Sequence, residues 1–239
     1  MKGKKVYNSK ALVWWGLAGV VLLAFILRLA WVLNVHTYPI SDFGWYHERA
    51  LGLIHGQGYS VNGKPTAYWP IGYPLFLAGL YKLFGPHYYV AKAANVIMGS
   101  LTAGLTYLIG NRLAGFWTGL FAGLALALMP SQIEWTSVLC SEILFTFLLL
   151  ASTYLLVVKR PERQGWLYPA VSGLLLGAAS LVRATSLALP LGAFVFYWIF
   201  RRSFRQAKFI QLLGVKFRKF YQSDTNAYLF SLTPTHPPL

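Results

Sequence analysis

Carboxylates are scarce in this chain, and their placement is the first indication of chemistry. The sequence holds six acidic residues, which are Asp42, Glu48, Glu134, Glu142, Glu162 and Asp224. If the apolar runs cross a membrane in turn from an inside N-terminus, the first four of these acids lie on or near the outer face. Positioned carboxylates can move protons in an enzyme. Rare acids gathered at one membrane face therefore predict a site there.

Asp42 opens a segment whose spacing predicts a short helix over residues 42–56. At ~100° per residue, Asp42 shares one stripe with Tyr46, Ala50 and Leu53. Glu48 points about 120° away, toward water, by the same periodicity. A structural role is also open, because Ser41 and Asp42 could simply begin the helix, where an acid favours the positive end of the dipole. The two roles are compatible.

Glu142 stands inside an apolar run, 17 residues before Lys159. A helix of that length places it about 26 Å from the cytoplasmic end, just below the outer interface. An ionisable group at the centre of a membrane helix costs ~2.5–3.5 kcal/mol, so it usually has a partner or a task. Arg28 and Arg183 lie near the same level by similar counting. A buried ion pair between Glu142 and Arg28 is therefore one prediction.

Arg183 is followed by hydroxyl-bearing Thr185 and Ser186. A planar guanidinium donates two parallel hydrogen bonds, which suits a phosphate. Alternatively, Arg183 extends to the lipid headgroups. Five histidines show no metal-ligand spacing, and Cys140 is the single cysteine, so neither a multi-cysteine metal site nor an intrachain disulfide is expected. No cofactor is predicted, although a divalent metal stays open.

The elements that must position these residues are membrane helices. Apolar residues make up 56% of the chain and charged residues only 11%, whereas soluble domains carry roughly 25% charge. The formal charge of +15 sits in short clusters between apolar runs, which excludes the continuous basic stripe of a nucleic-acid partner. The sequence predicts an all-α, polytopic membrane protein in contact with lipid.

About six spans are expected, from apolar runs at 11–33, 89–111, 115–130, 135–158 and 166–200, the last broken near Pro190. Basic residues then favour a cytoplasmic N-terminus over residues 1–10. The outer loop at 34–88 is expected to carry interfacial helices at 42–56 and 71–84. Residues 201–239 are expected to form a basic cytoplasmic stretch and a disordered tail.

These residues resemble a known family. Asp42, Tyr46 and the Gly56-Gln57-Gly58-Tyr59 block, followed by Trp69-Pro70-Ile71-Gly72-Tyr73-Pro74, are similar to GT-C glycosyltransferases of the dolichyl-phosphate-mannose protein mannosyltransferase and aminoarabinose transferase group. Asn95, Pro130, Ser141-Glu142 and Arg183 continue the likeness. It covers roughly residues 15–200.

The resemblance implies a reaction at the cell membrane. A sugar on a polyprenyl-phosphate lipid would pass, with inversion at the anomeric carbon, to an acceptor that the sequence does not identify. Asp42 would be the general base and Glu142 would support the site. Arg183 would hold the lipid phosphate. Arg28, Tyr46 and Tyr73 are further substrate-binding candidates.

Two departures from the family pattern leave other functions open. Phe43 stands where members often carry a second acid, and members are much longer than this chain. A truncated product is therefore expected, with an inactive remnant or partner subunit as one alternative. A transporter is another alternative, but it would place charges near the membrane midplane.

Overall fold

The computed structural model describes residues 10–38, 40–157 and 166–188. Several sequence predictions lie outside these residues. They concern most of the cytoplasmic N-terminal segment, the basic turn at 158–165, the second half of the run at 166–200, and the stretch at 201–239.

The described part of the chain is almost entirely helical. Its helices are α1 (Lys10–Asn34), α2 (Asp42–Ile54), α3 (Gly72–Phe84), α4 (Tyr88–Ala114), α5 (Phe116–Leu128), α6 (Pro130–Glu134), η1 (Trp135–Ser137), α7 (Ser141–Val157), α8 (Leu167–Val182) and η3 (Ala184–Leu187). Two short strands, β1 (Ser60–Val61) and β2 (Lys64–Pro65), pair antiparallel. The predicted all-α membrane fold is confirmed.

By length and composition, α1 and α4 can each cross a membrane, and the bent pair formed by α5 with residues 130–137 can form a third span. Helices α7 and α8 are apolar but shorter within the described residues. Six spans stay a prediction. One predicted boundary was wrong: α7 begins at Ser141 rather than residue 135. Helix α8 ends at Val182, and the break expected near Pro190 lies outside the described residues.

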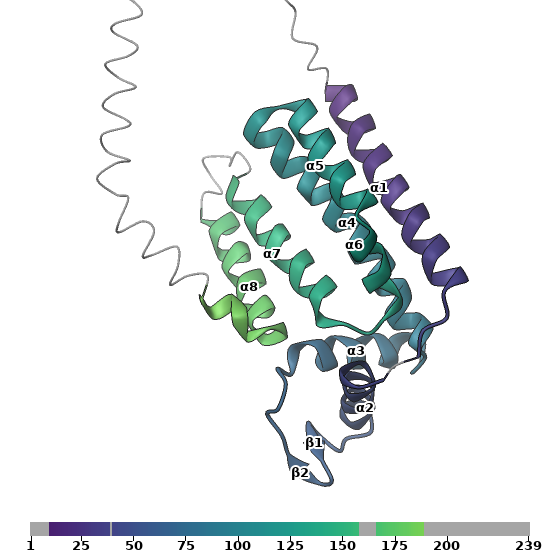
Figure 1. The fold of residues 1–239 in the computed structure, drawn as a ribbon. Coiled ribbons are helices and arrows are strands. Elements are labelled where there is room, and N and C mark those ends of the chain that lie inside the picture. The colour runs from purple at the N-terminus through teal and green to yellow at the C-terminus, as the bar shows by residue number, and fades with distance from the viewer. Residues whose placement is uncertain (1–9, 39, 158–165, 189–239) are drawn as a thin grey trace, which may run out of the picture. The chain divides into compact units, whose positions relative to one another are not determined.

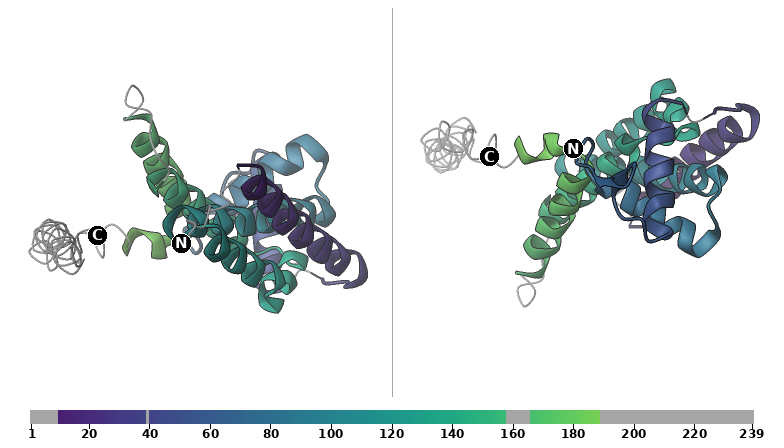
Figure 2. Two further views of the ribbon diagram at one scale, coloured as in Figure 1. Left: turned by 90° about the horizontal axis from the view of Figure 1, so that it is seen from above. Right: turned by 90° about the horizontal axis from the view of Figure 1, so that it is seen from below.

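The long helices pack around α4. Figures 1 and 2 show α7 and α8 side by side on one side of α4, with α1 on the other. Glycines allow α5 to approach α4 closely. A Cβ at Gly119 would lie 2.6 Å from the backbone oxygen of Tyr107, and one at Gly123 would lie 2.9 Å from the Tyr107 Cβ. Small residues at such contacts are how membrane helices gain close packing.

A proline breaks the apolar run after α5. Met129, which precedes Pro130, is extended, as expected before proline. The chain then turns by 59°. Pro130 has no N–H to donate to the carbonyl four residues earlier, at Leu126. Arg28 supplies donors instead: Nη2 donates to the Leu126 oxygen at 3.1 Å and Nη1 to the Ala127 oxygen at 3.2 Å.

The predicted outer loop forms a small layer at one end of the long helices. Helices α2 and α3 match the interfacial helices expected at 42–56 and 71–84. They lie across that end in Figure 1, with the β-hairpin beyond them. The Tyr46 and Tyr73 rings join the two helices edge to face, with centroids 5.0 Å apart. The hairpin itself was not predicted.

Candidate functional site

A pocket of about 830 Å³ opens where four separate segments meet. Helix α2 contributes Asp42 and Tyr46, the start of α7 contributes Ser141 and Glu142, and the end of α8 with η3 contributes residues 180–185. The residues on either side of the hairpin supply the remaining wall, which consists of Tyr59, Thr66, Ala67, Tyr68, Trp69, Pro70 and Ile71. Three ionisable residues singled out from sequence, Asp42, Glu142 and Arg183, thus line one pocket.

Asp42 and Tyr46 reach the pocket from successive turns of α2. Asp42 is the first residue of the helix and is exposed, while Tyr46 is only 8% exposed. The helix begins at Asp42 with Ser41 as its N-cap residue, as expected, although Ser41 has φ 54° and makes no side-chain capping hydrogen bond. The predicted stripe is confirmed at Tyr46 and Ala50, which are buried, with Glu48 exposed as expected, while Asp42 at its start is exposed. Burial raises the pKa of Tyr46.

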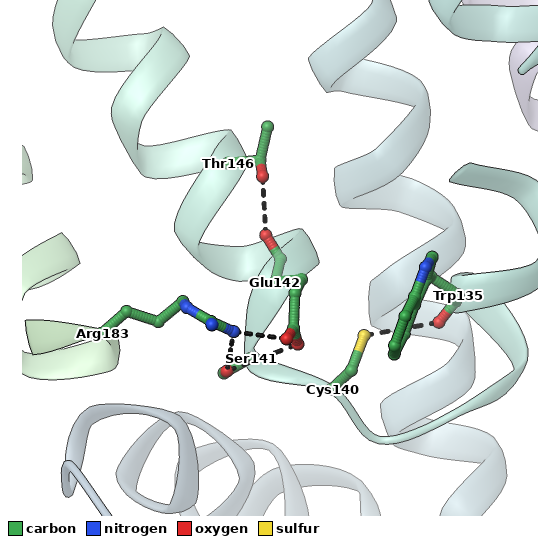
Figure 3. A network of polar contacts seen from close by, with 6 residues as sticks. All are labelled: Trp135, Cys140, Ser141, Glu142, Thr146 and Arg183. Atoms are coloured by element: carbon green, nitrogen blue, oxygen red, sulfur yellow. Dashed lines mark hydrogen bonds and ion pairs between the residues drawn. The ribbon is translucent and has the colours of Figure 1, made fainter. Parts of the chain in front are cut away.

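Glu142 and Arg183 form an ion pair at the pocket wall (Figure 3). Glu142 is in the first turn of α7, where the helix dipole favours an anion. The Arg183 guanidinium reaches it from the end of α8 and contacts the Ser141 hydroxyl at 3.2 Å. The side chains are 44% exposed for Glu142 and 35% for Arg183. The pair is therefore accessible to a ligand in the pocket.

The end of α8 aims Arg183 at the pocket. Arg183 is extended, with φ −143° and ψ 122°, although its N–H still donates to the Ala179 oxygen at 2.9 Å. A cation is favoured at this carbonyl end of the helix. Gly72 of α3 lies directly against the same end, since a Cβ there would be 2.5 Å from the Leu181 backbone carbon and oxygen. Close backbone contact between α3 and α8 thus fixes the position of the Arg183 backbone, from which the side chain extends to the pocket.

Aromatic side chains form the wall on the hairpin side. The Tyr59 hydroxyl donates to the Trp69 oxygen at 2.8 Å, and burial raises the pKa of Tyr59 to about 12. Trp45 lies behind the wall, with its ring centroid 5.7 Å from that of Tyr59 and 6.2 Å from that of Tyr68. Tyr68 itself is 75% exposed. This wall offers flat apolar faces opposite the charged pair.

Arg28 does not belong to the site. It is 1% exposed, lies outside the pocket lining and donates hydrogen bonds to the backbone oxygens of Ala24, Leu126 and Ala127. The predicted ion pair between Glu142 and Arg28 is wrong, because Glu142 pairs with Arg183. Counting residues placed Arg28 and Glu142 at a similar depth in the membrane, but this did not imply contact, since the Arg28 side chain turns toward the end of α5.

Tyr73 also lies outside the pocket lining. Its side chain is fully buried beneath Tyr46, and burial raises its pKa well above the usual value. Its place is that of a support for Tyr46 rather than a contact surface for a ligand. Within the described residues, no group of three or more His, Cys, Asp or Glu side chains is placed to hold a metal ion.

Sequence reasoning named Ser141, Tyr59 and Trp69 in the family likeness but assigned none of them a place in the site. The hairpin beside the aromatic wall was missed although it had a usable signal: Asn62-Gly63 is the dipeptide that favours a two-residue turn with positive φ. Their φ values are 50° and 74°, and the flanking register is Val61 with Lys64. Apart from the likeness, Ser141 had no signal, because a serine beside an acid in an apolar run is common on helices of every kind.

Fold and site together define an all-helical membrane protein with a carboxylate and arginine pocket at one end of its long helices. The family model for dolichyl-phosphate-mannose-protein mannosyltransferases matches residues 69–217, more than half of the chain. The chain belongs to this family, which confirms the glycosyltransferase resemblance seen in the sequence. The match covers Glu142 and Arg183 and begins after Asp42. No curated protein and no solved structure matches the chain.

Proposed function

We propose that this chain transfers a sugar from a polyprenyl-phosphate donor to an acceptor hydroxyl at the outer membrane face, with inversion. The observation that carries the proposal is the meeting of Asp42, Glu142 and Arg183 in one pocket. These residues come from three helices that are far apart in sequence. Membership of a family named for dolichyl-phosphate-mannose donors supports the same class of substrate.

Each residue has a distinct task in the proposed reaction. An acceptor hydroxyl must lose a proton as it attacks the anomeric carbon, and Asp42 accepts that proton. The carbon–oxygen bond to the lipid phosphate breaks, and the phosphate leaves with increased negative charge. Arg183 stabilises that charge, because a preorganised cation at a site of developing charge lowers the barrier. Glu142 holds the guanidinium toward the pocket.

The aromatic wall completes the proposed site. Tyr59, Tyr68 and Trp69 present flat faces beside the charged groups. A ligand that packs against these faces displaces water from the pocket, which strengthens its interaction with the charged groups. The exposed face of Tyr68 is suited to stacking on a sugar ring. No step in this proposal uses a metal.

Replacing Asp42 tests the proposal directly. In membranes containing mannosyl-phosphoryl polyprenol with a radiolabelled sugar, Asp42→Asn should reduce transfer to endogenous acceptors by ~10²-fold or more, since it removes the base. The matched control is Glu48→Gln, an exposed carboxylate on the same helix that does not line the pocket. It should retain transfer within about twofold, as expected for an acid with no part in proton transfer.

Two results would count against the proposal. Full transfer by Asp42→Asn would remove this carboxylate from the mechanism. No transfer by the wild-type chain from mannosyl, glucosyl or aminoarabinosyl donors would overturn the proposed activity itself. Membrane levels of each variant, measured by quantitative immunoblot, exclude a loss of insertion as the cause.

A further inference from the structure

We infer that Ser141 is a positioning residue that holds Arg183 and Glu142 in the orientation they present to the pocket. The inference rests on the proposed function in taking the ligand of Arg183 to be a lipid-linked phosphate. It concerns a residue whose hydroxyl touches both members of the ion pair. Ser141 is the first residue of α7 and is only 2% exposed.

The Ser141 hydroxyl lies between the two charged groups. Its Oγ accepts a hydrogen bond from Arg183 Nη1 at 3.2 Å and donates one to Glu142 Oε2 at 3.4 Å. Figure 3 shows the guanidinium and the carboxylate meeting at this hydroxyl. The same Nη1 atom also contacts Glu142 Oε1. One guanidinium nitrogen is therefore held by two neighbouring side chains at the start of α7.

The Ser141 hydroxyl is matched to its two charged neighbours. A hydroxyl has one proton to donate and two lone pairs that accept. Arg183 uses one lone pair and Glu142 takes the proton. Tyr46 of α2 lines the same pocket as Ser141. Ser141 is thus a buried hydroxyl that bonds to both members of the ion pair at once.

The need for a positioning group follows from the arginine itself. Arg183 begins from an extended residue after a helix end, and its side chain is about one-third exposed. A long side chain in that setting has many rotamers, and fixing them costs conformational entropy. Glu142 alone supplies attraction with little direction in a hydrated site. A neutral hydroxyl on the first turn of a helix adds direction without competing for the phosphate.

Binding of a phosphate lipid measures this role without any transfer reaction. The probe is farnesyl monophosphate, added to the full chain in detergent micelles and followed by microscale thermophoresis. Ser141→Ala should weaken binding about tenfold, the usual effect of losing a hydrogen bond to a charged group. Ser141→Thr keeps the hydroxyl and should bind within about threefold of wild type.

The matched control is Ser100→Ala. Ser100 is also 2% exposed, but its hydroxyl donates to the Val96 oxygen of its own helix, at 2.6 Å. It lies outside the pocket lining. If loss of a buried serine hydroxyl acted only through stability, Ser100→Ala and Ser141→Ala would change binding alike. We expect the first to bind as wild type does.

The Arg183→Gln variant distinguishes failure of the positioning role of Ser141 from failure of the phosphate contact of Arg183. If Arg183→Gln weakens binding while Ser141→Ala binds like wild type, the positioning role is overturned and the phosphate role of Arg183 stands. If Arg183→Gln binds like wild type, or the wild-type chain does not bind the probe, the proposed function loses its phosphate contact. The positioning role is then decided by coupling in the ligand-free protein.

That coupling comes from thermal unfolding of Ser141→Ala, Arg183→Gln and the double variant. Residues in one hydrogen-bond network give non-additive effects, whereas distant ones add. The same cycle with Ser100→Ala in place of Ser141→Ala should be additive. Additive shifts in both cycles would overturn the inference even if the probe never binds. A Ser141→Thr variant that fails to fold leaves the Ala variants and both cycles to decide.

Discussion

Arg183 and Arg28 differ in exposure and in the groups that their guanidinium contacts. Arg183 lies at the end of α8, forms an ion pair with Glu142 and has a side chain that is 35% exposed. Arg28 is 1% exposed and directs its guanidinium at two carbonyls in the last turn of α5: that of Leu126, whose helical donor is missing at Pro130, and that of Ala127. Gly99 makes room for it, because a Cβ there would lie 2.9 Å from Arg28 Nε. Arg183 therefore lines the pocket, and Arg28 donates hydrogen bonds to carbonyl groups at the end of α5.

This assignment predicts that Arg28 and Pro130 are coupled in stability. Arg28→Leu leaves two carbonyls without donors, at about 1–3 kcal/mol each, partly offset by removing a buried charge. Pro130→Ala restores an N–H for the Leu126 carbonyl, so Arg28→Leu should be better tolerated in that background. Thermal unfolding in micelles of both single variants and the double variant measures the coupling, which should be roughly 1 kcal/mol.

The same variants test whether Arg28 touches the ligand. Folded Arg28→Leu protein should bind farnesyl monophosphate like wild type, because the side chain lies outside the pocket lining. A large loss of binding together with additive stability effects would return Arg28 to the site and contradict its role at the break in α5.

At the scale of elements, the helices in the outer layer and the break at Pro130 were predictable, whereas the end of α8 was not. Pro and Gly punctuation framed α2 and α3, and both formed where the sequence placed them. The apolar run at 115–130 ends at the proline that follows α5. The end of α8 at Val182 falls inside the run at 166–200, and the sequence analysis placed no break there. The position of Arg183 depends on this helix end. Its alignment with Glu142 required knowing which helices are neighbours, which no local pattern reports.

Close contact between α3 and α8 predicts a sensitive glycine. Gly72→Ala would place a Cβ 2.5 Å from backbone atoms of Leu181, so one helix end must move. Overpacking of this kind costs about 1–3 kcal/mol. Because Arg183 follows directly, sugar transfer and binding of farnesyl monophosphate should both fall by more than the loss of folded protein explains.

Gly79→Ala on the same helix is the matched control. No atom lies within 4 Å of a Cβ at Gly79. Alanine is the better helix former by about 0.5–1 kcal/mol, so this variant should unfold at an equal or higher temperature and bind normally. If both substitutions have the same effect, the contact of Gly72 with α8 does not position Arg183.

At the scale of the whole molecule, the pocket and the basic helix ends lie at opposite ends of the long helices. Lys10 begins α1 and Arg112 stands in the last turn of α4, whereas α2, α3 and the hairpin lie at the other end (Figure 1). Basic residues are enriched on the cytoplasmic side of membrane proteins. Arg49, Lys64, Lys82 and Lys92 depart from this rule, as all four belong to the pocket end. An external pocket therefore stays a prediction.

The location of the pocket can be tested by cysteine labelling in intact cells, because the native Cys140 is buried and should stay unlabelled. Lys64→Cys, on the exposed β2 strand, should react with a membrane-impermeant maleimide added outside. Ala114→Cys, exposed at the end of α4, should react only after the membrane is permeabilised. Residue 64 lies at the pocket end and residue 114 at the other end of α4, which is long and apolar enough to cross a membrane. If α4 crosses the membrane, one of the two positions is outside when the other is inside. The reverse pattern would put Asp42, Glu142 and Arg183 on the cytoplasmic side, where the donor sugar of the proposed reaction would have to be presented instead.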